Sequence, residues 1–268
     1  MYDFIDILKA LAAILITNSH YDFIWPVSAL AMGGLLGDIM FFSASGFCLA
    51  NIRVSFPRWY LRRIIRIYPT LWIVTGAALL IGYLRVSSLG EVLSYFVYPT
   101  SYHFIASIML IYVLFYPLMW IYRKLNLKLI WIMGGVFAVY VIVYLTIFDA
   151  SYYHIDVVEE NMVRFLYLES MLLGVWFREK MDQQKIRVPE CCFGVVVSFF
   201  VSAVLYFASK LLFTAVDSLA PFQILNQITI FLLLCNGILL LCMWEVKGKR
   251  GYNKLTGGGY PMPVPYDA

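Results

Sequence analysis

The chain has 268 residues, of which 62% are hydrophobic and only 13% are charged, with a formal net charge of +4. Its mean hydropathy is +0.81, and a typical soluble domain carries about 25% charged residues. A water-soluble globular protein cannot bury this much apolar surface, so the composition excludes that class and indicates a membrane protein.

Eight apolar segments are each close to the length, ~20 residues, that a helix needs to cross a bilayer. The predicted membrane helices span residues 4–22, 29–51, 68–86, 103–122, 128–148, 162–178, 191–212 and 223–245. A shorter stretch at 91–99 is expected to lie at the membrane interface. The predicted fold is therefore all-α, a polytopic transmembrane bundle of about eight helices.

The chain is expected to divide into a transmembrane domain, residues 1–246, and a tail, residues 247–268. The tail is first basic and then rich in glycine and proline, in the run TGGGYPMPVPYDA. Such a sequence cannot form a packed element. We expect it to be disordered, or to be an end that does not belong to the fold.

Three ionisable side chains interrupt the first apolar segment, namely Asp6, Lys9 and His20. Lys9 lies one turn after Asp6, a spacing at which the two side chains can pair. Lys9 and His20 are eleven positions apart, which places both on one helical face and ~16 Å apart along the axis. Ionisable groups are costly in lipid and normally face protein or water. The alternative is that Asp6 and Lys9 reach the interface and that His20 is a polar residue at the outer edge.

The second segment contains the run GDIMFFSASGF, which is rich in small residues. Small side chains allow helices to approach closely in a membrane, so close packing is the favoured interpretation of Gly37, Ser43, Ala44, Ser45 and Gly46. The sequence places no base next to Ser45 that would make it a nucleophile.

An arginine cluster follows, made up of Arg53, Arg58, Arg62, Arg63 and Arg66. Arg62 and Arg66 are one turn apart and point the same way, and Pro69 is expected to open the next membrane helix. Guanidinium groups bind phosphate through paired hydrogen bonds, so the cluster suits an anionic ligand. The alternative is that these arginines only contact anionic lipid and set the orientation.

Polar side chains farther along the chain are fewer. His103 is expected to open a helix near the outer face, and His154 lies in an acidic loop where we expect it to be solvated. Glu169 stands alone inside an apolar segment, which marks it as a residue of interest without indicating a role.

Cysteine spacing supports neither a disulfide framework nor a metal site. The cysteines lie in or beside apolar segments, and we expect structural thiols at Cys48, Cys191, Cys192, Cys235 and Cys242.

Lysines and arginines are distributed unevenly between the two sides of the predicted bundle. One side collects the arginine cluster and the basic loops that follow, whereas the acidic loop around Asp149 and Asp156 lies on the other. With eight helices and both termini in the cytoplasm, every loop satisfies the positive-inside rule.

Four segments between residues 1 and 120 together resemble the membrane acyltransferase family 3, which includes bacterial polysaccharide O-acetyltransferases. They are IDILKALAAILITNSH, GDIMFFSASGF, WYLRRIIRIYPTLW and YHFIASIMLIYVLFYPL. The first holds the family's pattern of arginine or lysine, ten residues and histidine, as Lys9 and His20, with the usual upstream acid as Asp6. The second and third are similar to its G-V-x-x-F-F-x-x-S-G-F and R-R-x-x-R-I-x-P runs. Family members usually have ten membrane helices, so a C-terminally shortened chain is expected.

The resemblance implies transfer of an acyl group, most often acetyl, from cytoplasmic acyl-CoA to a hydroxyl of a cell-surface polysaccharide or lipid-linked sugar. It implies a bacterial inner-membrane location and His20 as the general base. Lys9 would position the donor or stabilise developing charge, and Asp6 would hold Lys9.

The resemblance also implies that Arg62, Arg63 and Arg66 contact the donor. His103 and Ser45 are the candidates for the acceptor side. Acyl-CoA is then a substrate, and neither a bound cofactor, a metal nor a nucleic-acid partner is expected.

Two other interpretations remain open. A helical bundle with a polar inner face and a basic mouth would also suit a transporter or flippase for an anionic substrate, although the sequence shows neither a duplicated half nor a pair of broken helices. The chain could also be an inactive truncated member of the family.

Overall fold

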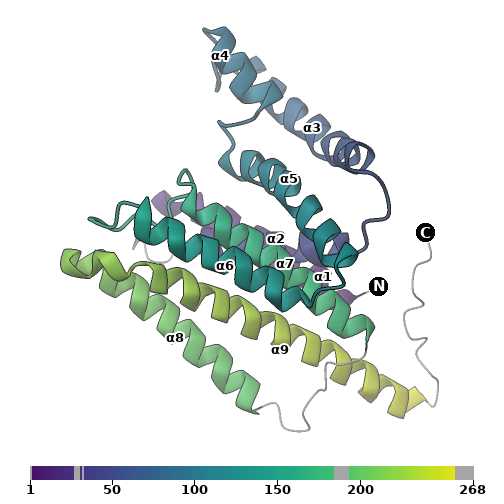
Figure 1. The fold of residues 1–268 in the computed structure, drawn as a ribbon. Coiled ribbons are helices and arrows are strands. Elements are labelled where there is room, and N and C mark those ends of the chain that lie inside the picture. Colours follow the sequence, from purple (N-terminus) through teal and green to yellow (C-terminus); the bar gives the residue numbers. More distant parts are fainter. Residues whose placement is uncertain (1, 27–30, 32, 184–192, 257–268) are drawn as a thin grey trace. The chain divides into compact units, whose positions relative to one another are not determined.

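The computed structural model describes residues 2–26, 31, 33–183 and 193–256. These residues form helices and connecting loops, with no strand among them (Figure 1). The predicted all-α fold is therefore confirmed. The Gly- and Pro-rich end at 257–268, together with Cys191 and Cys192, lies outside the described residues.

The chain divides into two compact units, and one of the two boundaries between them falls inside the helix Leu129–Thr146. The first unit comprises residues 1–50 and 135–268, and the second comprises residues 51–134. The long helices are α1 (Asp3–Ser19), α2 (Gly34–Leu49), α3 (Phe56–Leu80), α5 (His103–Lys124), α6 (Leu129–Thr146), α7 (Met162–Asp182), α8 (Phe193–Ala215) and α9 (Ile224–Thr256). The short ones are η1 (Asp22–Ile24), α4 (Leu89–Val92), η3 (Leu93–Val97) and η4 (Asp217–Phe222).

Each of the eight predicted membrane segments corresponds to one long helix, in the predicted order. Within the part of the chain that the structure describes, five stretches are long and apolar enough to cross a membrane, namely α3, α5, α6, α8 and the Ile224–Lys247 part of α9. The number of membrane crossings therefore remains a prediction. The short segment at 91–99 forms α4 and the π-helical turn η3.

The prediction that Pro69 opens a helix is wrong. α3 begins at Phe56, has Pro57 in its first turn, and continues through Pro69 to Leu80. Proline is favourable in the first turn, where its missing N–H has no helical partner. A proline inside a membrane helix is tolerated because neighbouring groups can satisfy the freed carbonyl. The arginine cluster therefore lies within the first half of a long helix.

Glycines allow the helices of the first unit to pack closely. A Cβ at Gly37 would lie 2.8 Å from the carbonyl oxygen of Ala12, so α2 meets α1 there. On the other face, a Cβ at Gly46 would overlap the carbonyl oxygen of Met171, and one at Gly174 would overlap that of Ser43. The predicted packing role of the small residues is confirmed at Gly37 and Gly46.

These contacts define the two ends of the first unit. Gly34, at the start of α2, meets Ser19 at the end of α1, so the two helices are antiparallel. At the opposite end, the ring of Phe47 lies 5.2 Å from that of Tyr2. α7 runs parallel to α2, because Tyr167 in its first half bonds to Asp38 and Gly174 in its second half meets Ser43. We call these ends the His20 end and the Tyr2 end.

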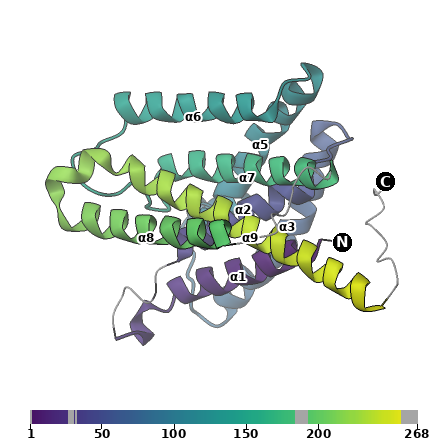
Figure 2. The same cartoon turned by 90° about the horizontal axis from the view of Figure 1, so that it is seen from below.

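The other helices of the first unit extend the same arrangement. α8 and α9 pack along each other, as both views show (Figures 1 and 2). Glu245 of α9 accepts a hydrogen bond from the backbone N–H of Phe4 at 2.9 Å, which places this part of α9 at the Tyr2 end. α9 therefore begins at the His20 end and continues past the predicted domain limit at residue 246 to Thr256.

The second unit is held together mainly by aromatic side chains. Trp59 of α3 packs edge-on against Tyr112 of α5, with the ring centroids 5.4 Å apart. The Tyr68 hydroxyl donates to the carbonyl of Val97 at 2.7 Å and ties η3 to α3. The basic first half of α3 is thereby fixed to α5.

Candidate functional site

Asp6 and Lys9 form an ion pair on α1. The Lys9 Nζ and the Asp6 Oδ1 are 3.2 Å apart, and both side chains are roughly half exposed. The predicted pairing of these residues is confirmed. The carboxylate holds the ammonium on one side of the helix and leaves further Nζ protons available to another oxygen.

His20 ends α1. Its backbone remains helical, with φ −89° and ψ −4°, and its side chain is exposed. Because the helix is continuous from Asp3, the spacing of Lys9 and His20 keeps them on one face. The imidazole stands at the end of the helix, where a substrate hydroxyl could reach it.

A shallow and mostly apolar groove of about 460 Å³ runs beside the last turns of α1. Trp25 closes one side, and its indole N–H donates to the Asn18 side-chain oxygen at 3.0 Å. The lining residues are Ala13, Ile14, Thr17, Asn18, Tyr21, Ile24 and Trp25. A hydrophobic group could therefore lie within one turn of His20.

Asp38 is a buried acid that the sequence analysis overlooked. Its carboxylate accepts a hydrogen bond of 2.7 Å from the hydroxyl of Tyr167, whose ring stacks on Phe42. The signal was an aspartate inside GDIMFFSASGF, a run interpreted only in terms of its small residues. The pair joins α2 to α7 near the His20 end.

Glu169 on α7 is buried, with only 7% of its surface exposed. Its Oε1 atom has no hydrogen-bond partner among the residues that the structure describes. The residue faces the protein rather than lipid, as expected for an ionisable group in a membrane helix.

The predicted donor-binding arginines lie on α3, in the second unit. Arg62 and Arg66 are exposed and one turn apart, and neither pairs with a carboxylate within the described part of the chain. Arg63 is partly buried, with its guanidinium carbon 5.9 Å from the centre of the Trp59 ring. The site residues thus fall into two groups, because Asp6, Lys9 and His20 belong to the first unit.

The two acceptor-side candidates are also separated between the units. His103 is the first residue of α5, as expected, and is exposed. Ser45 is partly buried on α2, next to the close contact at Gly46. Nothing in the described residues brings a base to the Ser45 hydroxyl.

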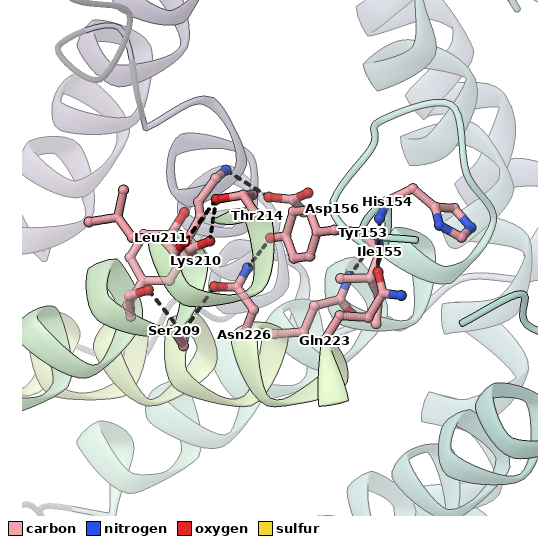
Figure 3. A network of polar contacts seen from close by, with 12 residues as sticks. Tyr153, His154, Ile155, Asp156, Ser209, Lys210, Leu211, Thr214, Gln223 and Asn226 are labelled. Atoms are coloured by element: carbon pink, nitrogen blue, oxygen red, sulfur yellow. Dashed lines mark hydrogen bonds and ion pairs between the residues drawn. The ribbon is translucent and has the colours of Figure 1, made fainter. Parts of the chain in front are cut away.

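The prediction that His154 is solvated is wrong, because only 6% of it is exposed. Its loop is held by side chains from α8, from α9 and from Gln223, which directly precedes α9 (Figure 3). Gln223 accepts from the backbone N–H groups of His154 and Ile155 at 2.8 and 2.9 Å. In the same network, Lys210 pairs with Asp156 at 2.7 Å. Amide side chains far along the chain therefore order a loop that looked solvent-exposed in sequence.

The loop network also surrounds Tyr153. Its hydroxyl accepts a hydrogen bond from Asn226 at 2.9 Å, and burial raises the pKa of Tyr153 above its usual value. The phenol therefore stays neutral and acts here as a structural group.

At the Tyr2 end, Arg178 lies against two aromatic rings. Its guanidinium carbon is 5.0 Å from the centre of the Tyr2 ring and 5.3 Å from that of Phe47, and its Nε donates to Asp182 at 2.8 Å. Burial, with the hydrogen bond to Asp182, raises the pKa of Tyr2 to about 12. This cluster joins the beginning of α1 to the ends of α2 and α7.

The long apolar helices and the inward-facing acids define the class of a multi-pass membrane protein whose polar groups gather inside one helical unit. The model of acyltransferase family 3, described as an acyltransferase domain, matches residues 2–258. The chain therefore belongs to this family, and acyl transfer is the activity that the family indicates. No match was found among curated proteins or among solved structures.

Proposed function

We propose that the protein transfers an acetyl group from cytoplasmic acyl-CoA to a hydroxyl of a cell-surface polysaccharide or lipid-linked sugar in a bacterial inner membrane. The observation that carries the proposal is the arrangement on α1, where the Asp6–Lys9 pair and an accessible His20 share one helix of a family member. An exposed imidazole suits proton removal from a hydroxyl at neutral pH.

In the proposed reaction, His20 takes the proton of the acceptor hydroxyl as its oxygen attacks the thioester carbonyl. The new carbon–oxygen bond forms, the carbon–sulfur bond breaks, and the proton passes from the imidazolium to the departing thiolate. Lys9, held by Asp6 about three helical turns from His20, positions the donor rather than the reacting carbonyl.

The donor carries several phosphate charges, which Arg62 and Arg66 would bind with Arg63 beside them. Both are exposed in the first half of α3, one turn apart. Acceptor contacts would come from His103 and Ser45. A transporter or flippase for an anionic substrate would use the same arginines but would release no CoA.

The test is mass spectrometry of surface polysaccharide from cells that carry wild-type or variant protein, with free CoA measured in isolated membranes. His20→Ala should lower transfer by about 10²–10⁴-fold, the usual loss when a general base is removed, with the membrane level of the protein unchanged. Wild-type transfer by this variant would exclude His20 as the base. Absence of transfer and of CoA release in the wild type would refute the acyltransferase proposal.

The donor site has its own variants. Arg62→Ala with Arg66→Ala should raise the apparent KM for acyl-CoA, and lysine should restore it only in part because it lacks the planar guanidinium. The matched control is Lys124→Ala with Lys128→Ala, which removes two exposed charges outside the cluster. An equal rise in KM for the control would mean a general electrostatic effect rather than a site.

Orientation is tested by cysteine labelling in a variant without native cysteines. Asn51→Cys and Leu127→Cys should label from the cytoplasm and Ser151→Cys from outside, and all three positions are exposed. Leu127 is preferable to Asn126, whose φ of +47° disfavours most side chains. Labelling of Leu127→Cys from outside would break the proposed topology.

A further inference from the structure

Four rings form a continuous stack that leads from the core of the first unit to its surface. Tyr144 stacks on Phe148 at 5.2 Å, Phe148 on His154 at 4.5 Å, and His154 on Tyr152 at 4.1 Å, between ring centroids. Tyr144 and His154 are buried, whereas Tyr152 is 54% exposed. The stack therefore presents a supported aromatic ring at the surface.

The backbone beneath Tyr152 is fixed by buried amide side chains. Gln223 donates to the carbonyl of Tyr152 at 2.9 Å and accepts from the N–H groups of His154 and Ile155. Gln227 donates to the carbonyl of Ile155 at 2.7 Å. Because Gln223 and Gln227 are almost fully buried, the loop keeps one conformation, and little conformational entropy remains to be lost when a ligand binds Tyr152.

Asp149 supplies a carboxylate three positions before Tyr152 in the chain. Asp149 accepts from the backbone N–H of Ser151 at 2.9 Å, and the hydrogen bonds from Ser151 hold the pKa of this exposed carboxyl below its usual value. Asp149 is therefore ionised at neutral pH and can accept hydrogen bonds from hydroxyl groups. A supported aromatic ring in the same loop as an ionised carboxylate suits a hydroxyl-rich ligand and disfavours an anionic one.

The loop lies at the same end of the first unit as His20. α7 begins directly after the loop and runs parallel to α2, which itself begins beside the end of α1. An acceptor that delivers a hydroxyl to His20 must approach this end. Tyr152 is thus on the correct side of the unit to hold a part of the same acceptor away from the reacting hydroxyl.

We infer that Tyr152 is a stacking platform for a sugar ring of the acceptor glycan, with Asp149 accepting hydrogen bonds from its hydroxyls. The inference rests on the proposed function. The C–H groups on one face of a pyranose carry slight positive charge, which the negative face of an aromatic ring attracts. Tyr152 is then a binding and positioning residue that touches the acceptor outside the reacting centre.

The experiment measures transfer by the full-length protein in membranes to surface polysaccharide purified from cells that lack the gene. Tyr152→Ala should raise the apparent KM for polysaccharide about tenfold, because an aromatic anchor is lost. Hydrolysis of acetyl-CoA without acceptor should stay unchanged. Tyr152→Trp should retain wild-type KM, because it keeps the aromatic face.

Tyr83→Ala is the matched control, since Tyr83 is an even more exposed tyrosine that lacks this support. Tyr152→Leu separates a sugar platform from a membrane-interface anchor, because leucine keeps an apolar side chain without a π face. An unchanged KM in Tyr152→Ala or Tyr152→Leu, with active wild type, would overturn the inference. Inactive wild type would instead refute the proposed function.

Discussion

α7 and α3 are both long helices that carry arginines, yet they differ in how much of their side-chain surface is buried. Most of α7 is buried, including Glu169 and Ser170. In α3 only Trp59, Tyr68, Leu71 and Thr75 are buried, and the apolar residues Ile73 and Leu80 are exposed. In a bilayer, apolar side chains gain little from burial in protein, because lipid is an equally good solvent. Buried polar and small residues, such as Glu169 and Ser170, therefore distinguish α7 from α3 better than apolar residues, which occur on both helices.

The largest effect is expected from a substitution that forces α2 and α7 apart. Gly46→Ala should destabilise the protein by roughly 3 kcal/mol, the upper end of overpacking penalties, since the new Cβ would overlap a backbone carbonyl that cannot move alone. The measurement is thermal unfolding of the detergent-solubilised protein.

Gly76→Ala on α3 is the control. A Cβ at Gly76 has no atom within 4 Å, so alanine should be neutral or stabilise the helix by up to about 1 kcal/mol. Equal unfolding temperatures for the two variants would show that the α2–α7 contact does not hold the first unit together.

The buried acid offers a second and smaller test. Tyr167→Phe removes the hydroxyl that donates to Asp38 and leaves a buried carboxylate without this bond. We expect a loss of about 1–3 kcal/mol in the free energy of unfolding. Tyr83→Phe, at an exposed position, should change it by less than about 0.5 kcal/mol.

A double variant sharpens the same test. If Tyr167→Phe costs less when Asp38 is already asparagine, the two groups are energetically coupled. Additive losses would show that the Tyr167 hydroxyl and the Asp38 carboxyl are not energetically coupled, since phenylalanine keeps the stacking on Phe42.

The smallest effect is expected at α4 in the second unit. Glu91 accepts from the Ser87 N–H at 2.7 Å, and this bond holds the pKa of the exposed Glu91 below its usual value. A depressed pKa means that the stabilisation is present above the unfolded-state pKa and is lost as pH falls through the folded-state pKa. In Glu91→Gln, residues 88–97 should exchange amide hydrogens slightly faster than wild type near neutral pH. A difference that persisted in acid would exclude the carboxylate as its cause.

Hydropathy predicted the helices well because each apolar run is a local property of the chain. The Asp6–Lys9 pair was predictable for the same reason, since three residues along a helix bring them together. Pro69 was misinterpreted because proline usually interrupts soluble helices, whereas a membrane helix can accommodate it. The eight-helix crossing count, the division at residue 246 and the roles of the site residues stay predictions.

Long-range partners could not be inferred from local pattern. His154 lies in an acidic loop, and its backbone is held by the amide of Gln223, sixty-nine positions away. Asp38 was missed because its partner Tyr167 is 129 positions away. In each case the decisive contact joins segments whose proximity depends on how whole helices pack.

The bond between Glu245 and the N–H of Phe4 has a consequence for biosynthesis. α1 has no side-chain cap of its own at Tyr2, and the acceptor for its first turn is supplied 241 positions later. During translation, the Phe4 N–H therefore stays without this acceptor until residue 245 has been made. The first turn of α1 thus gains this acceptor only after α9 has been made, and a nascent chain released before residue 245 would lack the bond.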